Sequence, residues 1–346
     1  MSKKQFLIAL KIVVSVGLMS VLISGIDLGA ERDRILAADI GLLLAAAAVL
    51  AMQVAIGGAR WWIVMRAIGT PMPIIDLTRL FWVGGFFSQA LPSSVGGDPI
   101  RIYMTYKEGG MSLGKAINGV MLERIVTIVG LVVLVALVQP SFLPKIDENA
   151  RMLTISALVM LGAGTVVGII VLMCLDRLPE SLTRFRIVRG MHTLAGDTRR
   201  LFLHPVHAGL AIVFGVLTHV NISFCVFLLA QSLAIDVTWL DCMVLMPPVI
   251  LVTTLPISIA GWGVREGAMT VAFALVGVSQ GGAVVLSLSM GLLAIVIMAP
   301  AGLVWLLGRK RGQSISAAEA EAAVEEELVH ATENTPESAP DSKPGA

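Results

Sequence analysis

The sequence predicts an all-α polytopic integral membrane protein, with about six full spans and two re-entrant hairpins arranged as an inverted-topology repeat. Of its 346 residues, 56% are hydrophobic and only 14% are charged, and the mean hydropathy is +0.87. A soluble domain could not keep this much apolar surface from water. A motif that recurs in the two halves and the distribution of loop charges predict the rest of the architecture.

Eight apolar segments account for most of the chain. Six of them are long and uninterrupted enough to span a bilayer, near residues 6–25, 40–59, 117–138, 152–175, 207–231 and 283–308. The first follows Lys3 and Lys4 but lacks a small-residue cleavage site, so we expect an uncleaved span. Segments 80–95 and 244–260 are interrupted by Pro, Gly, Ser and Thr and make poor straight spans.

A Gly/Pro-rich motif recurs at equivalent places in the two halves. Residues 91–101 read LPSSVGGDPIR, and residues 255–265 read LPISIAGWGVR, without a gap. A second pair of similar segments follows, at 110–116 and 277–283, and each precedes a long apolar run. Broken elements at corresponding places in the two halves of a membrane protein are typical of repeat-built transporters. Coincidental similarity of two turns is the alternative.

Loop charges predict that the two broken segments do not cross the membrane. The positive-inside rule places the basic segments in the cytoplasm, namely the N-terminus, 60–79, 98–116, 176–206 and 309–311. The remaining segments carry few basic residues and are expected outside, namely 27–39, 139–151, 232–241 and 267–282. Residues 80–97 must then enter and return from the cytoplasm, and residues 242–264 from the other face. Eight plain spanning helices are the alternative.

The apolar segments and the loop charges together predict the domain organisation. We expect a membrane domain over 1–311, with one repeat half at about 1–138 and the other at about 152–308, and both termini in the cytoplasm. Residues 312–346 hold eight acidic residues and one lysine, which predicts a disordered acidic cytoplasmic tail. The protein is expected in the cell inner membrane.

Three stretches carry a family resemblance, namely 91–101, GMSLGKAINGVMLER at 110–124 and LPISIAGWGVREGA at 255–268. They resemble the flippase-like family that shares the lysylphosphatidylglycerol synthase transmembrane region. The matching positions are Arg60, Trp61, Pro92, Gly96, Gly97, Asp98, Arg101, Glu123, Arg124, Gly261, Gly263, Arg265 and Glu266. Many relatives carry an Asp where this chain has Thr127, and the chain shows no aminoacyl-transferring domain after Arg311. The resemblance implies movement of an anionic or modified lipid between leaflets, without lysyl transfer.

The two arginines that close the repeated motif are the leading candidates for binding an anionic headgroup. Arg101 and Arg265 each follow a Gly-rich turn and present a planar, permanently charged fork suited to phosphate. Pairing of each with a nearby carboxylate, Asp98 or Glu266, is the alternative. We assign hairpin structure to Pro92, Gly96, Gly97, Pro256, Gly261 and Gly263.

Glu123 and Arg124 lie inside the apolar run that follows the first motif. Adjacent helix positions point about 100° apart, so each needs a partner on another element. For Glu123 we expect Arg101 or Arg265. A static salt bridge and a protonatable coupling group are both open for this carboxyl.

The sequence predicts a lipid flippase rather than an enzyme. It contains no phosphate-binding loop, nucleophile elbow, zinc motif or clustered cysteines, so we expect no cofactor, no metal and no nucleic-acid partner. An integral-membrane headgroup enzyme and a scaffold subunit for a separate lipid or glycolipid synthesis enzyme are the alternatives. Membrane lipids are the expected ligands, and homo-oligomers and a lipid-synthesis enzyme remain open as partners.

Overall fold

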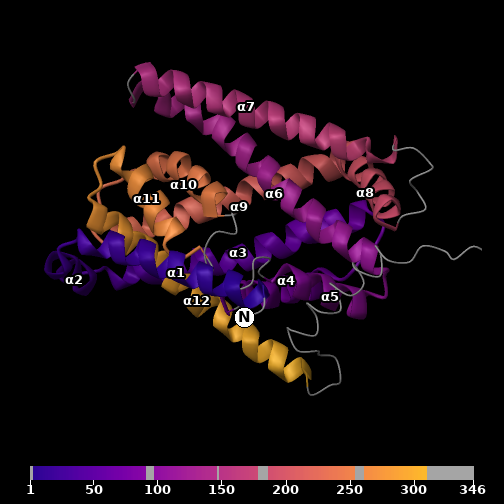
Figure 1. Ribbon diagram of the computed structural model, residues 1–346, viewed down its shortest axis with the longest axis horizontal. Coiled ribbons are helices and arrows are strands. Elements are labelled where there is room, and N and C mark those ends of the chain that lie inside the picture. The colour runs from indigo at the N-terminus through magenta and orange to yellow at the C-terminus, as the bar shows by residue number, and fades with distance from the viewer. Residues whose placement is uncertain (1–2, 91–96, 146–147, 178–185, 254–260, 310–346) are drawn as a thin grey trace, which may run out of the picture.

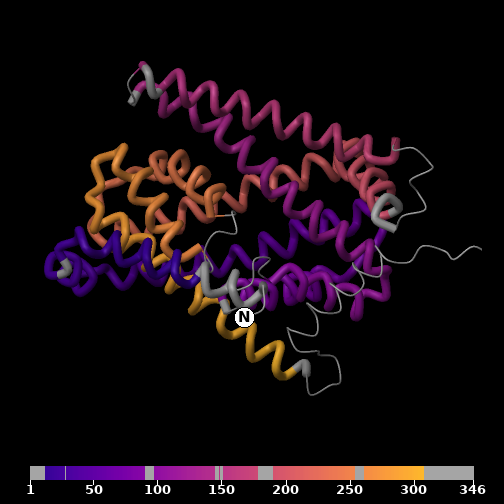
Figure 2. The backbone as a smooth tube through the Cα atoms, viewed as in Figure 1, coloured from indigo at the N-terminus to yellow at the C-terminus, as the bar shows by residue number. Residues whose placement is uncertain are grey.

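The computed structural model describes residues 3–90, 97–145, 148–177, 186–253 and 261–309. These residues form twelve α-helices and two short 3-10 turns. Figures 1 and 2 show how the helices are arranged. The bounds are α1 Lys3–Ser24, α2 Leu28–Leu36, α3 Ile40–Ala67, α4 Ile74–Ala90, α5 Asp98–Gly109, α6 Leu113–Phe142, η1 Leu143–Lys145, α7 Glu148–Met173, η2 Leu175–Arg177, α8 Arg186–Phe202, α9 Pro205–Ser232, α10 Trp239–Thr253, α11 Val264–Ala274 and α12 Gln280–Arg309. The all-α prediction is confirmed.

A run of four helices recurs along the chain with closely matched lengths. Helices α3 and α9 have 28 residues each, and α6 and α12 have 30 each. Between them lie two short helices, of 17 and 12 residues in the first set and of 15 and 11 in the second. The packing recurs as well, because α4 against α12 has its counterpart in α10 against α6. The two copies of the motif therefore lie in two series of four helices with similar lengths and similar packing.

The equivalent helices α3 and α9 pack against each other and run antiparallel. The Asp39 amide at the start of α3 donates to the Ser232 carbonyl at the end of α9 at 2.9 Å. Further along, the Cys225 thiol meets the Ala46 carbonyl at 3.5 Å, and the Asn221 amide donates to the Val49 carbonyl at 2.9 Å. Opposite directions of equivalent helices are what an inverted repeat requires.

Each copy of the motif lies between two short helices that pack as a hairpin. Near the tip of the first hairpin, the Gly97 amide donates to Ser88 Oγ at 2.8 Å, and at its open end Arg79 pairs with Glu108. Helices α4 and α5 are therefore antiparallel. Helices α10 and α11 also pack together, and Thr253 lies beside Gly261 at their tip. Residues 91–96 and 254–260 lie outside the described part of the chain.

The hairpins are longer than the sequence predicts. Residues 98–116 were expected as a cytoplasmic loop, but most of them form α5. Residues 267–282 likewise contain much of α11. The physical reason is that the Gly-rich motif breaks the helix at the tip of the hairpin, and a second helical arm follows it. Arg101 and Arg265 therefore lie in the first turn of a return arm.

Glycine is required at three of the predicted hairpin positions. A Cβ at Gly97 would collide with the Gly84 carbonyl oxygen, so glycine lets α4 and α5 approach closely. Gly261 and Gly263 have φ of 81° and 85°, in the left-handed region that favours glycine. The other three positions, Pro92, Gly96 and Pro256, lie outside the described residues.

The long helices are those of a multi-pass membrane protein. Among the described residues, five are long and apolar enough to span a bilayer, namely α3, α6, α7, α9 and α12, and all five coincide with predicted spans. A sixth is counted if α1 and α2, bent by 95°, form one span. Helix α3 runs eight residues beyond the predicted end at 59, so Arg60 lies within a helix and not in a loop. Figure 1 shows α7 along one edge of the bundle, beside α6 and α8.

Two hydrophobic cores support the two hairpins. The first surrounds α4 and α5 and includes the fully buried side chains of Trp61, Leu77 and Leu122. The second surrounds α10 and α11 and includes Met246 and Phe273. The first hairpin thus packs against α3, α6 and α12, and the second against α6, α9 and α12. Broken backbone survives in a membrane protein where it packs against protein in this way.

Candidate functional site

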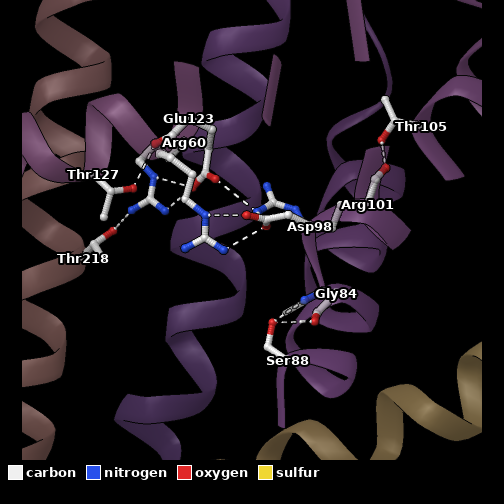
Figure 3. A network of polar contacts seen from close by, with 11 residues as sticks. Arg60, Gly84, Ser88, Asp98, Arg101, Thr105, Glu123, Thr127 and Thr218 are labelled. Carbon is white, nitrogen blue, oxygen red and sulfur yellow. Dashed lines mark hydrogen bonds and ion pairs between the residues drawn. The ribbon is translucent and has the colours of Figure 1, made fainter. Parts of the chain in front are cut away.

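A charged network lies where the first hairpin meets three long helices (Figure 3). At its centre is Glu123 of α6, whose side chain is 1% exposed. Its Oε1 accepts from Arg60 Nε of α3 at 3.0 Å and also pairs with Arg60 Nη2. Arg60 Nη1 donates to Thr218 Oγ1 of α9. Two charges this deeply buried are stable only when paired in this way.

Arg101 of α5 reaches the same carboxylate from the opposite side. Its Nη1 donates to Glu123 Oε2 at 3.1 Å and to Asp98 Oδ1 at 3.3 Å. The guanidinium lies 4.1 Å from the centre of the Trp61 ring and 4.9 Å from that of Phe81, which are cation–π contacts. Of the two partners expected for Glu123, the structure therefore shows Arg101.

Arg124 forms the outer part of the network. Its Nε and Nη2 donate to the two carboxylate oxygens of Asp98 at 3.0 and 2.8 Å, a bidentate pair. The Arg124 side chain is 54% exposed, whereas that of Arg101 is 3% exposed. Asp98 thus bridges a buried and an exposed guanidinium. Glu123 and Arg124 do not pair with each other, as their helical spacing predicts.

The network carries one positive charge in excess. Three arginines, Arg60, Arg101 and Arg124, face two carboxylates, Asp98 and Glu123. In addition, Arg101 Nε and Nη2 are buried and have no hydrogen-bond partner among the described residues. Buried donors without partners are costly, so this arrangement favours an additional anionic acceptor.

The second hairpin carries a smaller cluster. Arg265 Nη2 donates to Glu266 Oε1 at 2.8 Å, and its Nε donates to Ser287 Oγ at 3.0 Å. Ser287 Oγ also donates to Glu266 Oε1 at 2.9 Å, and the Gly263 amide donates to Glu266 Oε2 at 2.6 Å. The Arg265 guanidinium lies 5.1 Å from the centre of the Trp262 ring. One arginine balances one carboxylate, so this cluster has no excess charge.

The two motif arginines have equivalent backbone positions but different partners. The Arg101 amide donates to the Gly97 carbonyl, and the Arg265 amide to the Gly261 carbonyl, at 3.0 and 2.8 Å. Contacts between described residues place them in two separate clusters, one per half. Each arginine also pairs with a nearby carboxylate, as the alternative reading of the motif expects.

Sequence reasoning missed three members of the network. Arg60 and Trp61 were noted only as part of the resemblance, and Thr218 was not singled out. Arg60 could have been found from its place directly after the apolar run 40–59. An arginine buried there needs a carboxylate partner. Thr127, which replaces a common Asp, donates to the Glu123 carbonyl oxygen at 2.9 Å, and its own carbonyl lies 2.9 Å from His219 Nε2.

The fold and the site define a polytopic helical membrane protein that buries an arginine–carboxylate network beside a helical hairpin. Residues 8–314 match the family described as the lysylphosphatidylglycerol synthase TM region. The chain belongs to this family, as the motif resemblance suggested. A comparison with curated proteins finds no match.

Proposed function

We propose that this protein is an inner-membrane lipid flippase that moves an anionic or modified phospholipid between leaflets. The observation that carries the proposal is the excess positive charge of the network, together with the buried Nε and Nη2 donors of Arg101, which have no hydrogen-bond partner among the described residues. A phosphate offers several acceptor oxygens for these donors and a negative charge that balances the excess positive charge. Membership of the family makes a lipid-related role the natural context.

The proposed architecture is an inverted repeat in which the two hairpins are re-entrant. The antiparallel packing of α3 and α9 and the two similar series of four helices support it. The arms of 12 and 11 residues are about 18 and 16 Å long at 1.5 Å per residue, which is too short to cross a hydrocarbon core of about 30 Å. In this arrangement both termini are cytoplasmic.

In the proposed mechanism the lipid phosphate competes with Asp98. It contacts the exposed Arg124 first, displaces the Asp98 carboxylate, and then reaches the free donors of Arg101. Arg265, which is 11% exposed and held by Glu266, serves the same headgroup at a later step. Alternating access between two similar halves would let Arg101 and Arg265 contact the headgroup one after the other.

Glu123 acts as a positioning residue in this proposal. It accepts from two guanidinium groups on two different helices, which favours a permanently ionised carboxylate over one that releases and binds protons. Its contacts hold Arg101 in the cluster while the lipid binds. A static role therefore fits the geometry better than proton coupling.

The test is a graded series at Arg101, with lipid translocation measured in proteoliposomes. Arg101→Lys keeps the charge but loses the planar fork, so it should retain more activity than Arg101→Ala without reaching wild-type rates. Thermal melting of the same proteins in detergent separates loss of function from loss of structure. Wild-type translocation by a stable Arg101→Ala protein would contradict the proposal.

Two other functions stay open as alternatives, an integral-membrane headgroup enzyme and a scaffold subunit for a separate lipid-synthesis enzyme. The described residues contain no group of three or more His, Cys, Asp or Glu side chains arranged to hold a metal ion. Membrane lipids are the proposed ligands, and a second copy of the chain or a lipid-synthesis enzyme is the proposed protein partner.

A further inference from the structure

An apolar groove lies between α3, α4 and α9, outside the charged network. Its volume is about 470 Å³, and it is lined by Ala55, Ile56, Ala59, Ile74, Ile75, Thr78 and Phe214. Two of the lining side chains, Ile74 and Ile75, are 42% and 77% exposed. Exposed apolar side chains beside membrane-spanning helices meet hydrocarbon, so the groove suits an acyl chain.

A basic cluster lies where α3 ends and α9 begins. Arg66 is exposed, and its guanidinium carbon is 4.8 Å from the centre of the Trp62 ring. The centres of the His204 and His207 rings are 4.3 Å apart. The antiparallel course of α3 and α9 brings these residues together.

The basic cluster and the groove share one face of α3. Ala55, Ala59, Trp62 and Arg66 are spaced four, three and four residues apart, which places them on one face of α3. The distance along α3 from the first to the last is about 16 Å at 1.5 Å per residue. One leaflet of the hydrocarbon core is about 15 Å thick, half of the roughly 30 Å total. A lipid whose phosphate lies at Arg66 would therefore place its acyl chain beside Ala55 and Ala59, which line the groove.

We propose that this surface is a peripheral binding site for an anionic glycerophospholipid. The phosphate contacts Arg66, His204 and His207, and one acyl chain fills the groove lined by Ala59 and its neighbours. The guanidinium, held over Trp62, supplies paired donors, and the two imidazoles add polar contacts. Charge complementarity selects an anionic lipid over a zwitterionic one.

The proposal is independent of lipid movement across the membrane. A lipid in this groove contacts the first turn of α4 through Ile74 and Ile75, and so reaches the first hairpin without entering the buried network. The site therefore exists whether or not the protein is a flippase. Failure of one proposal leaves the other standing.

Photoactivatable lipids test the site directly. The full chain is reconstituted with a phosphatidylglycerol probe or a phosphatidylcholine probe that carries the same diazirine-labelled acyl chain, and labelled peptides are identified by mass spectrometry. We expect the phosphatidylglycerol probe to label 55–59, 74–78 and Phe214 more strongly. Equal labelling of these residues by the two probes, or labelling by neither, would overturn the proposal.

Matched variants separate the headgroup contact from the groove. Arg66→Ala should lower the preference for phosphatidylglycerol about fivefold, the effect of one cationic residue near a membrane surface. Lys107→Ala removes an exposed cation from α5 and should leave the preference unchanged. Ala55→Trp should reduce labelling of the groove by both probes, whereas Ala157→Trp on the exposed face of α7 should not. An unchanged preference in a normally melting Arg66→Ala protein refutes the headgroup contact.

Discussion

Replacing Glu123 with methionine would leave two buried arginines without their shared carboxylate. The side chains of Glu123 and Arg60 are 1% and 4% exposed, so removing one partner costs about 3–5 kcal/mol of unfolding free energy. Arg101 keeps Asp98 at 3.3 Å and the Trp61 ring at 4.1 Å, so its added cost is smaller. We therefore expect Glu123→Met to destabilise the protein more than Arg60→Met, which leaves Glu123 paired with Arg101.

The double variant is the informative member of this series. Arg60→Met combined with Glu123→Met removes a charge of each sign, so its cost should fall short of the sum of the two single costs by about 1–3 kcal/mol. The assay is unfolding of the protein in bicelles by steric trapping, which reports the free energy directly. Costs that add to within about 0.5 kcal/mol would show that the two side chains do not interact as described.

Three further predictions concern the Asp98 carboxylate, the ion pair of Lys115 and the membrane topology. Asp98→Asn removes the carboxylate that pairs with the exposed Arg124. Phosphatidylglycerol should then bind more tightly, as measured by native mass spectrometry, while its translocation slows. Lys115→Ala removes the ammonium group that lies 2.5 Å from the buried Asp197 carboxylate and should lower the melting temperature. Arg200→Ala removes a second cation near Asp197, but its side chain is 63% exposed, so the melting temperature should change little. Single cysteines at Lys107 and Lys145 should be labelled from opposite faces of the membrane, and labelling from one face would contradict a membrane-spanning α6.

The long spans could be predicted because they depend on local properties of the chain. A run of apolar residues needs no knowledge of its neighbours, and five of the predicted spans coincide with long helices. The end of α3 was misplaced because hydropathy falls at the first charge, at Arg60. The helix continues because that charge is paired with Glu123, which is a tertiary contact.

The partners of the charged residues could be predicted only in part. Adjacent residues on a helix point about 100° apart, which correctly separated Glu123 from Arg124. The same rule does not hold for Arg265 and Glu266, which pair in the first turn of α11. The similarity of the two motif copies suggested similar surroundings for Arg101 and Arg265, but the structure shows one network with excess positive charge and one balanced pair. The difference was visible in the alignment, where Trp262 stands opposite Asp98.

We propose that Arg101 and Arg265 bind a phospholipid headgroup as it crosses the membrane. The most direct measurement is leaflet-resolved translocation of a labelled anionic phospholipid in proteoliposomes. The wild type is compared with the double variant that carries Arg101→Ala and Arg265→Ala. We expect translocation by the folded double variant to fall about tenfold or more, because charged hydrogen bonds to the phosphate are removed. Thermal melting of the same protein gives the folded fraction. Wild-type translocation by that stable double variant would contradict the account.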